Sequence, residues 1–280
     1  TEKFMDYGFM EAMMRSTTLP ARDLWYSEGH INYYYGGQYF AVFLTKLSHT
    51  KVELTYNLMR TFVAGLAFAM PFSLVYQMMS DRMKGQQKSE KVIKGLPFAA
   101  GFTAGTAVSI AGNMHYVIYA QFIPLIEKLT GKEVSSYWFP DATRYIGYNP
   151  YREEDRTIHE FPCYSFVLGD LHAHVVNIMF VLLVIALLYV WLRGVRKKTV
   201  PVETSMKDGK FWKEQLLMPH LLVISVLLGM FQWTNFWDFV IYYVVTLGTV
   251  LFANIIRFQG KIKKIIVVTF AQMAEIYLLA

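Results

Sequence analysis

The sequence has little cysteine: Cys163 is the only one among 280 residues. A single thiol cannot form an intramolecular disulfide, and it cannot supply the several thiolates of a cysteine-based zinc site. Cys163 is therefore interpreted as a small apolar filler. The sequence also lacks a convincing internal repeat or low-complexity tract.

Charge is scarce as well. Charged residues make up 17% of the chain, whereas hydrophobic residues make up 54% and aromatic residues 16%. This composition excludes a disordered or collagenous chain and is typical of a polytopic helical membrane protein. The net charge is +6. The basic residues fall in short loops between apolar runs, where the positive-inside rule explains them, so we expect the lipid bilayer and not nucleic acid as the partner.

Long apolar runs predict an all-α fold, a polytopic transmembrane helical bundle. The clearest run, residues 175–192, contains no charge and has the length of a helix that crosses a hydrocarbon core about 30 Å thick. Residues 36–47 are too short to cross and predict an interfacial juxtamembrane helix, and residues 6–15 predict a short helix. Six spans are expected in all, at residues 56–79, 96–123, 175–192, 216–233, 236–256 and, incompletely, 265–280.

The whole chain is predicted to form a single membrane domain, and its charge distribution predicts its orientation. Basic residues concentrate in the loops at 82–94, 193–213 and 257–264, which the positive-inside rule assigns to the cytoplasm. The segments predicted outside carry most of the carboxylates. In chain order we expect an external loop at 1–55, two spans within 56–123, an external loop at 124–171 and about four spans within 172–280.

The ends of the sequence suggest a fragment of a longer protein. The chain starts at Thr1, without an initiator methionine or a signal peptide, and its last apolar run stops before it has spanned a bilayer. At least one preceding membrane helix is expected to be missing.

The densest group of reactive side chains lies directly before the run at 175–192. It comprises His159, Glu160, Asp170, His172 and His174. In an extended segment the last three would project from one side, as a carboxylate and two imidazoles suited to a divalent metal ion. Alternatively, Asp170 caps the following helix, whose N-terminus can also hold a phosphate group.

The amino-terminal segment supplies a second group of candidates. Glu2 and Asp6 lie one helical turn apart, so they can share a divalent ion, or one of them can act as a general base. The alternative is an acidic first turn of an amphipathic helix. Tyr33, Tyr34 and Tyr35 can pack on an isoprenoid chain or a sugar ring, or they can form an ordinary interfacial belt.

The corner WTNFWD, between two predicted spans, is the third candidate. Thr234 or Asn235 can cap the helix that follows, with Asp238 in its first turn. A carboxylate near membrane depth is costly, which also makes Asn235 and Asp238 candidates for substrate binding.

Four stretches, EKFMDYGFMEAMMRS, INYYYGGQYFAVFLTKL, TIHEFPCYSFVLGDLHAH and TNFWDFVIY, carry a resemblance to a known family. In this order they resemble the YYY-domain family of bacterial and archaeal membrane proteins. That family is similar to the GT-C superfamily of membrane glycosyltransferases, which includes the protein O-mannosyltransferases and the lipid A aminoarabinose transferases. These enzymes carry an acidic motif in the first external loop and then a juxtamembrane helix, the places that Glu2 with Asp6 and residues 36–47 occupy here.

The resemblance implies transfer of a sugar from a polyprenyl-phosphate donor to an acceptor outside the cytoplasmic membrane of a bacterium or archaeon. Asp6 would be the catalytic base or a metal ligand, assisted by Glu2. Lys3, Arg15, His172 and His174 would neutralise the departing phosphate. The tyrosines replace a proline-containing stretch of better-known relatives. The sugar and the acceptor are not specified.

Two other functions remain open from the residues alone. One is a transporter with external carboxylates at its entrance, although the predicted spans carry almost no ionisable residues for a path across the membrane. The other is a metal-dependent hydrolase built on Asp170, His172 and His174.

Overall fold

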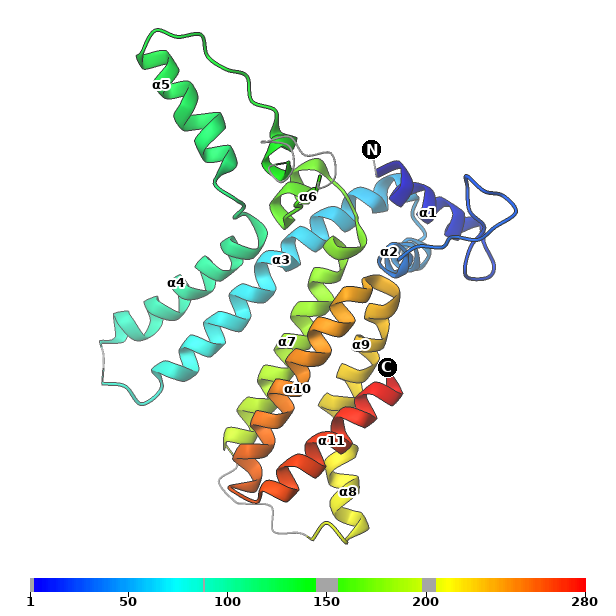
Figure 1. Cartoon of the computed structure of the whole chain (residues 1–280), viewed down its shortest axis with the longest axis vertical. Helices are drawn as coiled ribbons and strands as arrows, with labels where there is room; N and C mark the ends of the chain where they lie inside the picture. Colours follow the sequence, from blue (N-terminus) through cyan, green and yellow to red (C-terminus); the bar gives the residue numbers. More distant parts are fainter. Residues whose placement is uncertain (1–2, 88, 145–155, 198–204) are drawn as a thin grey trace. The chain divides into compact units, whose positions relative to one another are not determined.

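The computed structural model describes residues 3–87, 89–144, 156–197 and 205–280. These residues form helices and no β-strand; an isolated bridge joins Arg22 and His30. This confirms the predicted all-α class (Figure 1). The elements, with one π-helical segment (η1) and one 3₁₀ segment (η2), are α1 Lys3–Arg15, α2 Gly36–Leu47, α3 Val52–Met83, α4 Glu90–Ser109, η1 Val117–Phe122, α5 Ile123–Leu129, η2 Phe139–Thr143, α6 Pro162–Leu168, α7 Ala173–Lys197, α8 Gly209–Leu216, α9 Pro219–Thr234, α10 Phe236–Phe258 and α11 Ile262–Leu279.

Three of the described helices, α3, α7 and α10, are long and apolar enough to cross a membrane. They confirm the spans predicted at 56–79, 175–192 and 236–256. The shorter helices α8 and α9 meet at a 50° bend. If this bent pair is one span, it is a fourth candidate. By length and composition, the described residues thus hold three to four candidate spans, where six were predicted. The run at 265–280 is helical, but α11 carries Lys263, Lys264 and Glu275 among its 18 residues.

The helix predicted at 96–123 is interrupted, which corrects the second predicted span. Helix α4 ends at Ser109, and η1 begins at Val117. Between them the Asn113 side chain accepts a hydrogen bond from the His115 backbone N–H (3.2 Å) and donates one to the Ala142 carbonyl. Asparagine side chains that bond nearby backbone groups in this way compete with helix hydrogen bonds. Apolar composition alone did not reveal this competition.

The chain divides into two compact units, one of residues 1–70 with 170–280 and the other of residues 71–169. In the second unit, α4 packs closely against the end of α3 that begins at Pro71. A Cβ atom on Gly101 would lie 2.7 Å from the Phe72 carbonyl oxygen, so glycine is required for this approach.

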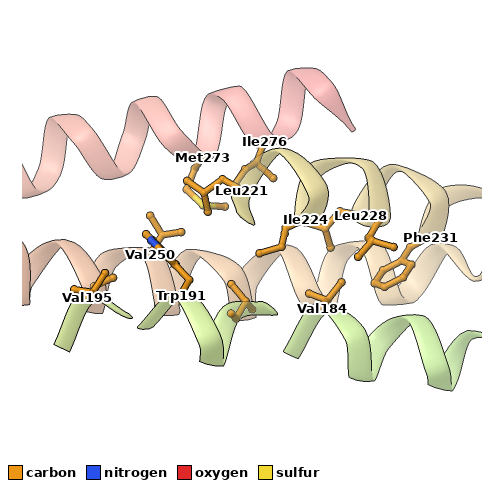
Figure 2. Packing of buried hydrophobic residues seen from close by; sticks show 13 residues of the cluster. Val184, Trp191, Val195, Leu221, Ile224, Leu228, Phe231, Val250, Met273 and Ile276 are labelled. Atoms are coloured by element: carbon orange, nitrogen blue, oxygen red, sulfur yellow. The ribbon is translucent and has the colours of Figure 1, made fainter. Parts of the chain in front are cut away.

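The first unit is built around a bundle of α7, α9, α10 and α11, whose buried side chains meet in one apolar core (Figure 2). On α7 the buried residues Val184, Leu188, Trp191 and Val195 recur every three or four positions, which places them on one face of the helix. Facing side chains come from the other three helices, namely Leu221, Ile224, Leu227, Leu228, Phe231, Val250, Ala253, Met273 and Ile276. Helices α1 and α2 lie at the end of this bundle where α7 begins, and α2 contacts α1, α7 and α9.

Candidate functional site

Helix α1 buries a carboxylate on its apolar face. Asp6 is fully buried, as are Phe9, Met10 and Met13, which follow it at helical spacing. The same periodicity that turns the apolar residues of α1 inward therefore turns Asp6 inward too. The predicted short helix at 6–15 is confirmed, but the acidic residue in its first turn does not face solvent.

Gln38 of α2 holds this carboxylate in place. Its side chain is fully buried, and its Nε2 donates to Oδ1 of Asp6 (2.9 Å) and to the carbonyl oxygen of Leu171 (2.9 Å). One amide thus connects α1, α2 and the segment that leads into α7. The other Asp6 oxygen, Oδ2, is buried and accepts no hydrogen bond of ordinary geometry from any described residue.

Two glycines at the start of α2 bring Gln38 to this position. A Cβ atom on Gly36 would lie 2.9 Å from Cγ2 of Thr234, and one on Gly37 would lie 2.9 Å from Cβ of Val176. Both distances are shorter than a side chain tolerates, so only glycine lets the first turn of α2 lie this close to α7 and α9.

The segment before α7 brings two further candidates to Asp6. Asp170 and His172 are buried, with 7% and 5% of their surface exposed, and both act on the charge of Asp6. His174 is exposed, and its ring stacks on that of His172 with 5.7 Å between centroids. Helix α7 begins at Ala173, so His172 rather than Asp170 directly precedes it. The interpretation of Asp170 as the N-cap residue is therefore corrected.

Burial dominates the electrostatics of Asp6. Removal from water disfavours the carboxylate and raises its pKa from 3.8 to about 6. His172, the hydrogen bond from Gln38 and the backbone of Leu171 lower the pKa, whereas the charge of Asp170 raises it. A group with a pKa near 6 is mostly ionised at neutral pH and still basic enough to accept a proton, as general-base catalysis requires.

The described residues contain no group of three His, Cys, Asp or Glu side chains that could hold a metal ion. Glu2 lies outside the described residues. A divalent ion bound by Glu2, Asp6, Asp170, His172 and His174 therefore stays a prediction.

A second polar cluster, partly buried, joins α7 to the corner between α9 and α10. Asn177 donates to Oδ2 of Asp238 (2.6 Å) and accepts from the Thr234 hydroxyl (2.8 Å), and Asn235 also donates to Oδ2 of Asp238 (2.9 Å). Asp238 lies in the first turn of α10, as predicted. Asn235 occupies the N-cap position, but its side chain makes no capping hydrogen bond. The cluster fastens three helix ends next to α2.

The candidate residues along α1 are spread over its length. Lys3 is half-buried in the first turn. Arg15 is exposed at the other end and pairs with Glu11 at 3.3 Å. Arg15 follows Asp6 by nine positions, which correspond to about 13 Å of helix, so Arg15 does not lie beside the Asp6 carboxylate.

The tyrosines divide between surface and interior. Tyr33 and Tyr34 are exposed and in contact with each other, with ring centroids 5.6 Å apart. Tyr35 is buried and packs edge-on against Trp233 at 5.4 Å. His159 and Glu160 are half-buried in the separate unit of residues 71–169.

Sequence reasoning missed Gln38, Asn177 and Tyr56. Tyr56 is buried on α3 within electrostatic range of Asp6 and Asp170. A signal existed for two of them, because Gln38 and Asn177 are single amide side chains in otherwise apolar runs. Polar side chains in such runs mark candidate sites. Tyr56 carried no such signal, since tyrosine is common at membrane interfaces.

Comparison with known proteins places this site in a membrane protein family. No curated protein and no solved structure matches the chain. The family described as uncharacterized membrane protein (DUF2298) matches residues 1–279. The match covers both units and every candidate residue named above. The chain therefore belongs to the DUF2298 family of membrane proteins.

Proposed function

We propose that this protein is a membrane glycosyltransferase that moves a sugar from a polyprenyl-phosphate donor to an extracytoplasmic acceptor. The observation that carries the proposal is Asp6, a fully buried carboxylate with a pKa near 6, whose position is fixed by the hydrogen bond from Gln38. A carboxylate restrained in this way suits a general base. The resemblance to GT-C enzymes supplies the reaction class.

In the proposed reaction, Asp6 removes the proton of the acceptor hydroxyl as the acceptor oxygen bonds to the anomeric carbon of the sugar. The bond between that carbon and the phosphate oxygen breaks, and polyprenyl phosphate leaves with the electron pair. Lys3, His172 and His174 are the cationic or protonatable groups proposed to stabilise the charge on the leaving phosphate. Glu2 is proposed to assist Asp6.

An apolar groove beside α2 supports a lipid-linked donor. Its volume is about 670 Å³, and α2 and α3 line it. The lining residues are Ala41, Leu44, Leu47, Ser48, Thr55, Leu58, Met59, Thr61 and Phe62. Helix α2 thus carries Gln38 at one end and an apolar surface along the turns that follow. Such a surface suits the isoprenoid chain of a donor.

The proposal is tested by turnover of the full-length protein in lipid nanodiscs. A panel of polyprenyl-phosphate-linked hexoses and aminosugars serves as donor, and the release of polyprenyl phosphate is measured by mass spectrometry. We expect release by the wild-type protein and a loss of at least 100-fold in Asp6→Asn, within the range that general-base catalysis contributes. Glu11→Gln is the matched control, because it removes a carboxylate from the same helix at a partly exposed position that pairs with surface Arg15.

Undiminished release by Asp6→Asn would remove Asp6 from the mechanism. Absence of release from every donor, together with uptake of intact substrate into proteoliposomes, would replace the glycosyltransferase with a transporter.

A further inference from the structure

A cavity of about 640 Å³ lies at the far end of the first unit, away from Asp6. It is formed where α8 and α9 meet at their 50° bend, against the last turns of α7 and α10. Its apolar wall includes Trp191, Val195 and Ile256, and its polar wall includes Gln215 and Arg257. The cavity is therefore amphipathic, and among the described residues that line it Arg257 is the one cation of fixed charge.

Arg257 is the feature that assigns a ligand to this cavity. Its guanidinium donates to Oε1 of Gln215 (2.5 Å) and to Oδ1 of Asn254 (3.1 Å), both neutral amide oxygens. In the part of the chain that the structure describes, no carboxylate lies within ion-pair distance of Arg257. A guanidinium has five N–H donors, so further donors and the full positive charge are left for an anion.

The amides around Arg257 hold it firmly. Asn254 is fully buried and donates to Oε1 of Gln272 (2.8 Å), and Nε2 of Gln272 donates to the carbonyl oxygen of Gln215 (3.0 Å). This chain of hydrogen bonds links α8, α10 and α11. It orients the guanidinium before any ligand arrives, which lowers the entropic cost of binding.

We propose that this cavity binds the phosphate group of an anionic membrane lipid, with Arg257 as the phosphate ligand and Trp191 and Val195 against the acyl chain. The cavity lies at the ends of two helices that can span a membrane, α7 and α10, which is where lipid headgroups meet protein. The sequence is strongly basic in the segments 193–213 and 257–264, which include the ends of α7 and α10. Basic residues at a membrane surface attract anionic lipids, and arginine suits phosphate because its planar donors can bind two oxygens.

Two other titratable groups line the cavity and affect its charge. Glu214 is exposed, and His220 is half-buried. The negative charge of Glu214 opposes an anion, so its removal strengthens binding, whereas removal of Arg257 weakens it. Opposite effects of two substitutions in one cavity distinguish a charge-selective site from an apolar crevice.

The test is thermal unfolding of the full-length protein in a neutral detergent. Dioctanoyl phosphatidylglycerol is titrated, with dioctanoyl phosphatidylcholine and inorganic phosphate as comparisons. We expect saturable stabilisation by phosphatidylglycerol, with a half-maximal concentration at least tenfold lower than for either comparison. In Arg257→Gln, which replaces the guanidinium with a neutral amide, the half-maximal concentration should rise about tenfold or more, because losing a hydrogen bond to a charged group weakens binding by at least a factor of ten. In Glu214→Gln it should fall.

A second variant leaves Arg257 in place. Gly194 lines the cavity and has no atom within 4 Å of an added Cβ, so Gly194→Phe fills the space without a backbone clash and should abolish the stabilisation. The matched control is Gly248→Phe, at an equally open position of α10 outside the cavity, which should respond like wild type. Equal stabilisation by inorganic phosphate would overturn the lipid assignment. An unchanged lipid response in both Arg257→Gln and Gly194→Phe would overturn the site.

Discussion

Replacing Asp6 with asparagine should stabilise the protein at neutral pH. Burial raises the pKa of Asp6 to about 6 from an ordinary value of 3.8. Each pKa unit corresponds to about 1.4 kcal/mol, so keeping Asp6 ionised in the folded protein costs about 3 kcal/mol. Asparagine carries no charge, and its side-chain oxygen can still accept the hydrogen bond from Gln38. The free energy of unfolding of the variant should therefore be up to about 3 kcal/mol higher than that of the wild-type protein. This difference is the stability that the wild-type protein loses by keeping an ionised carboxylate at this position for its chemistry.

The sign of the pH dependence follows from the raised pKa. Between about pH 4 and pH 6 the folded protein binds the Asp6 proton more tightly than the unfolded chain does, so the contribution of this group to stability falls as the pH rises through that window. Below about pH 4 the carboxyl group is protonated in both the folded and the unfolded state. The wild-type protein is then no longer less stable than Asp6→Asn. The difference between Asp6→Asn and wild type should accordingly be largest above pH 7 and vanish near pH 4.

Thermal unfolding of the full-length protein in a neutral detergent, from pH 4 to pH 8, measures this difference. At roughly 2 °C per kcal/mol for a chain of this size, we expect a midpoint about 6 °C higher for Asp6→Asn at pH 8. Glu11→Gln, a substitution on the same helix at a partly exposed carboxylate, should show no such shift. If the unfolding midpoint of Asp6→Asn were at or below that of the wild-type protein at every pH from 4 to 8, the assignment of Asp6 as a carboxylate destabilised by burial would be refuted.

Three further outcomes follow from the same contacts. The rate of polyprenyl phosphate release should rise with pH around a midpoint near 6, because Asp6 must lose its proton to act as a base; a pH–rate profile measures this. Gln38→Leu should move that midpoint upward, because the carboxylate loses its hydrogen-bond donor, and should cost about 1–3 kcal/mol in thermal unfolding. Gly37→Ala should also cost about 1–3 kcal/mol, because the new Cβ meets Val176 at 2.9 Å, whereas Gly248→Ala, in open space, should not destabilise the protein.

Local features of the chain were enough to predict much of the fold. Helices α3, α7 and α10 follow from apolar runs of membrane-spanning length that carry at most one charged residue each, and α2 lies where the shorter run at 36–47 predicted it. The interruption after Ser109 was not predictable from hydropathy. It depends on the Asn113 side chain, which bonds the Ala142 carbonyl far along the chain.

The candidate site was predicted only in outline. The sequence predicts Asp6, Asp170 and His172 as reactive side chains in segments assigned to the side of the membrane opposite the basic loops, and the structure brings these three together. The residue that orients Asp6 was overlooked, because Gln38 lies in an apolar helix whose sequence does not show which neighbour its amide faces.

What the sequence determined by itself is the membrane class, the all-helical fold and the position of the longest helices, because these depend on the polarity and length of contiguous segments. Only the tertiary structure decided that Asp6 is buried and that Gln38 connects it to the carbonyl of Leu171, which lies 133 residues after Gln38 in the sequence. It also decided that α8 and α9 bend around a cavity with Arg257 in its wall. These features depend on which helix faces meet, and packing across the bundle sets that choice rather than any local pattern.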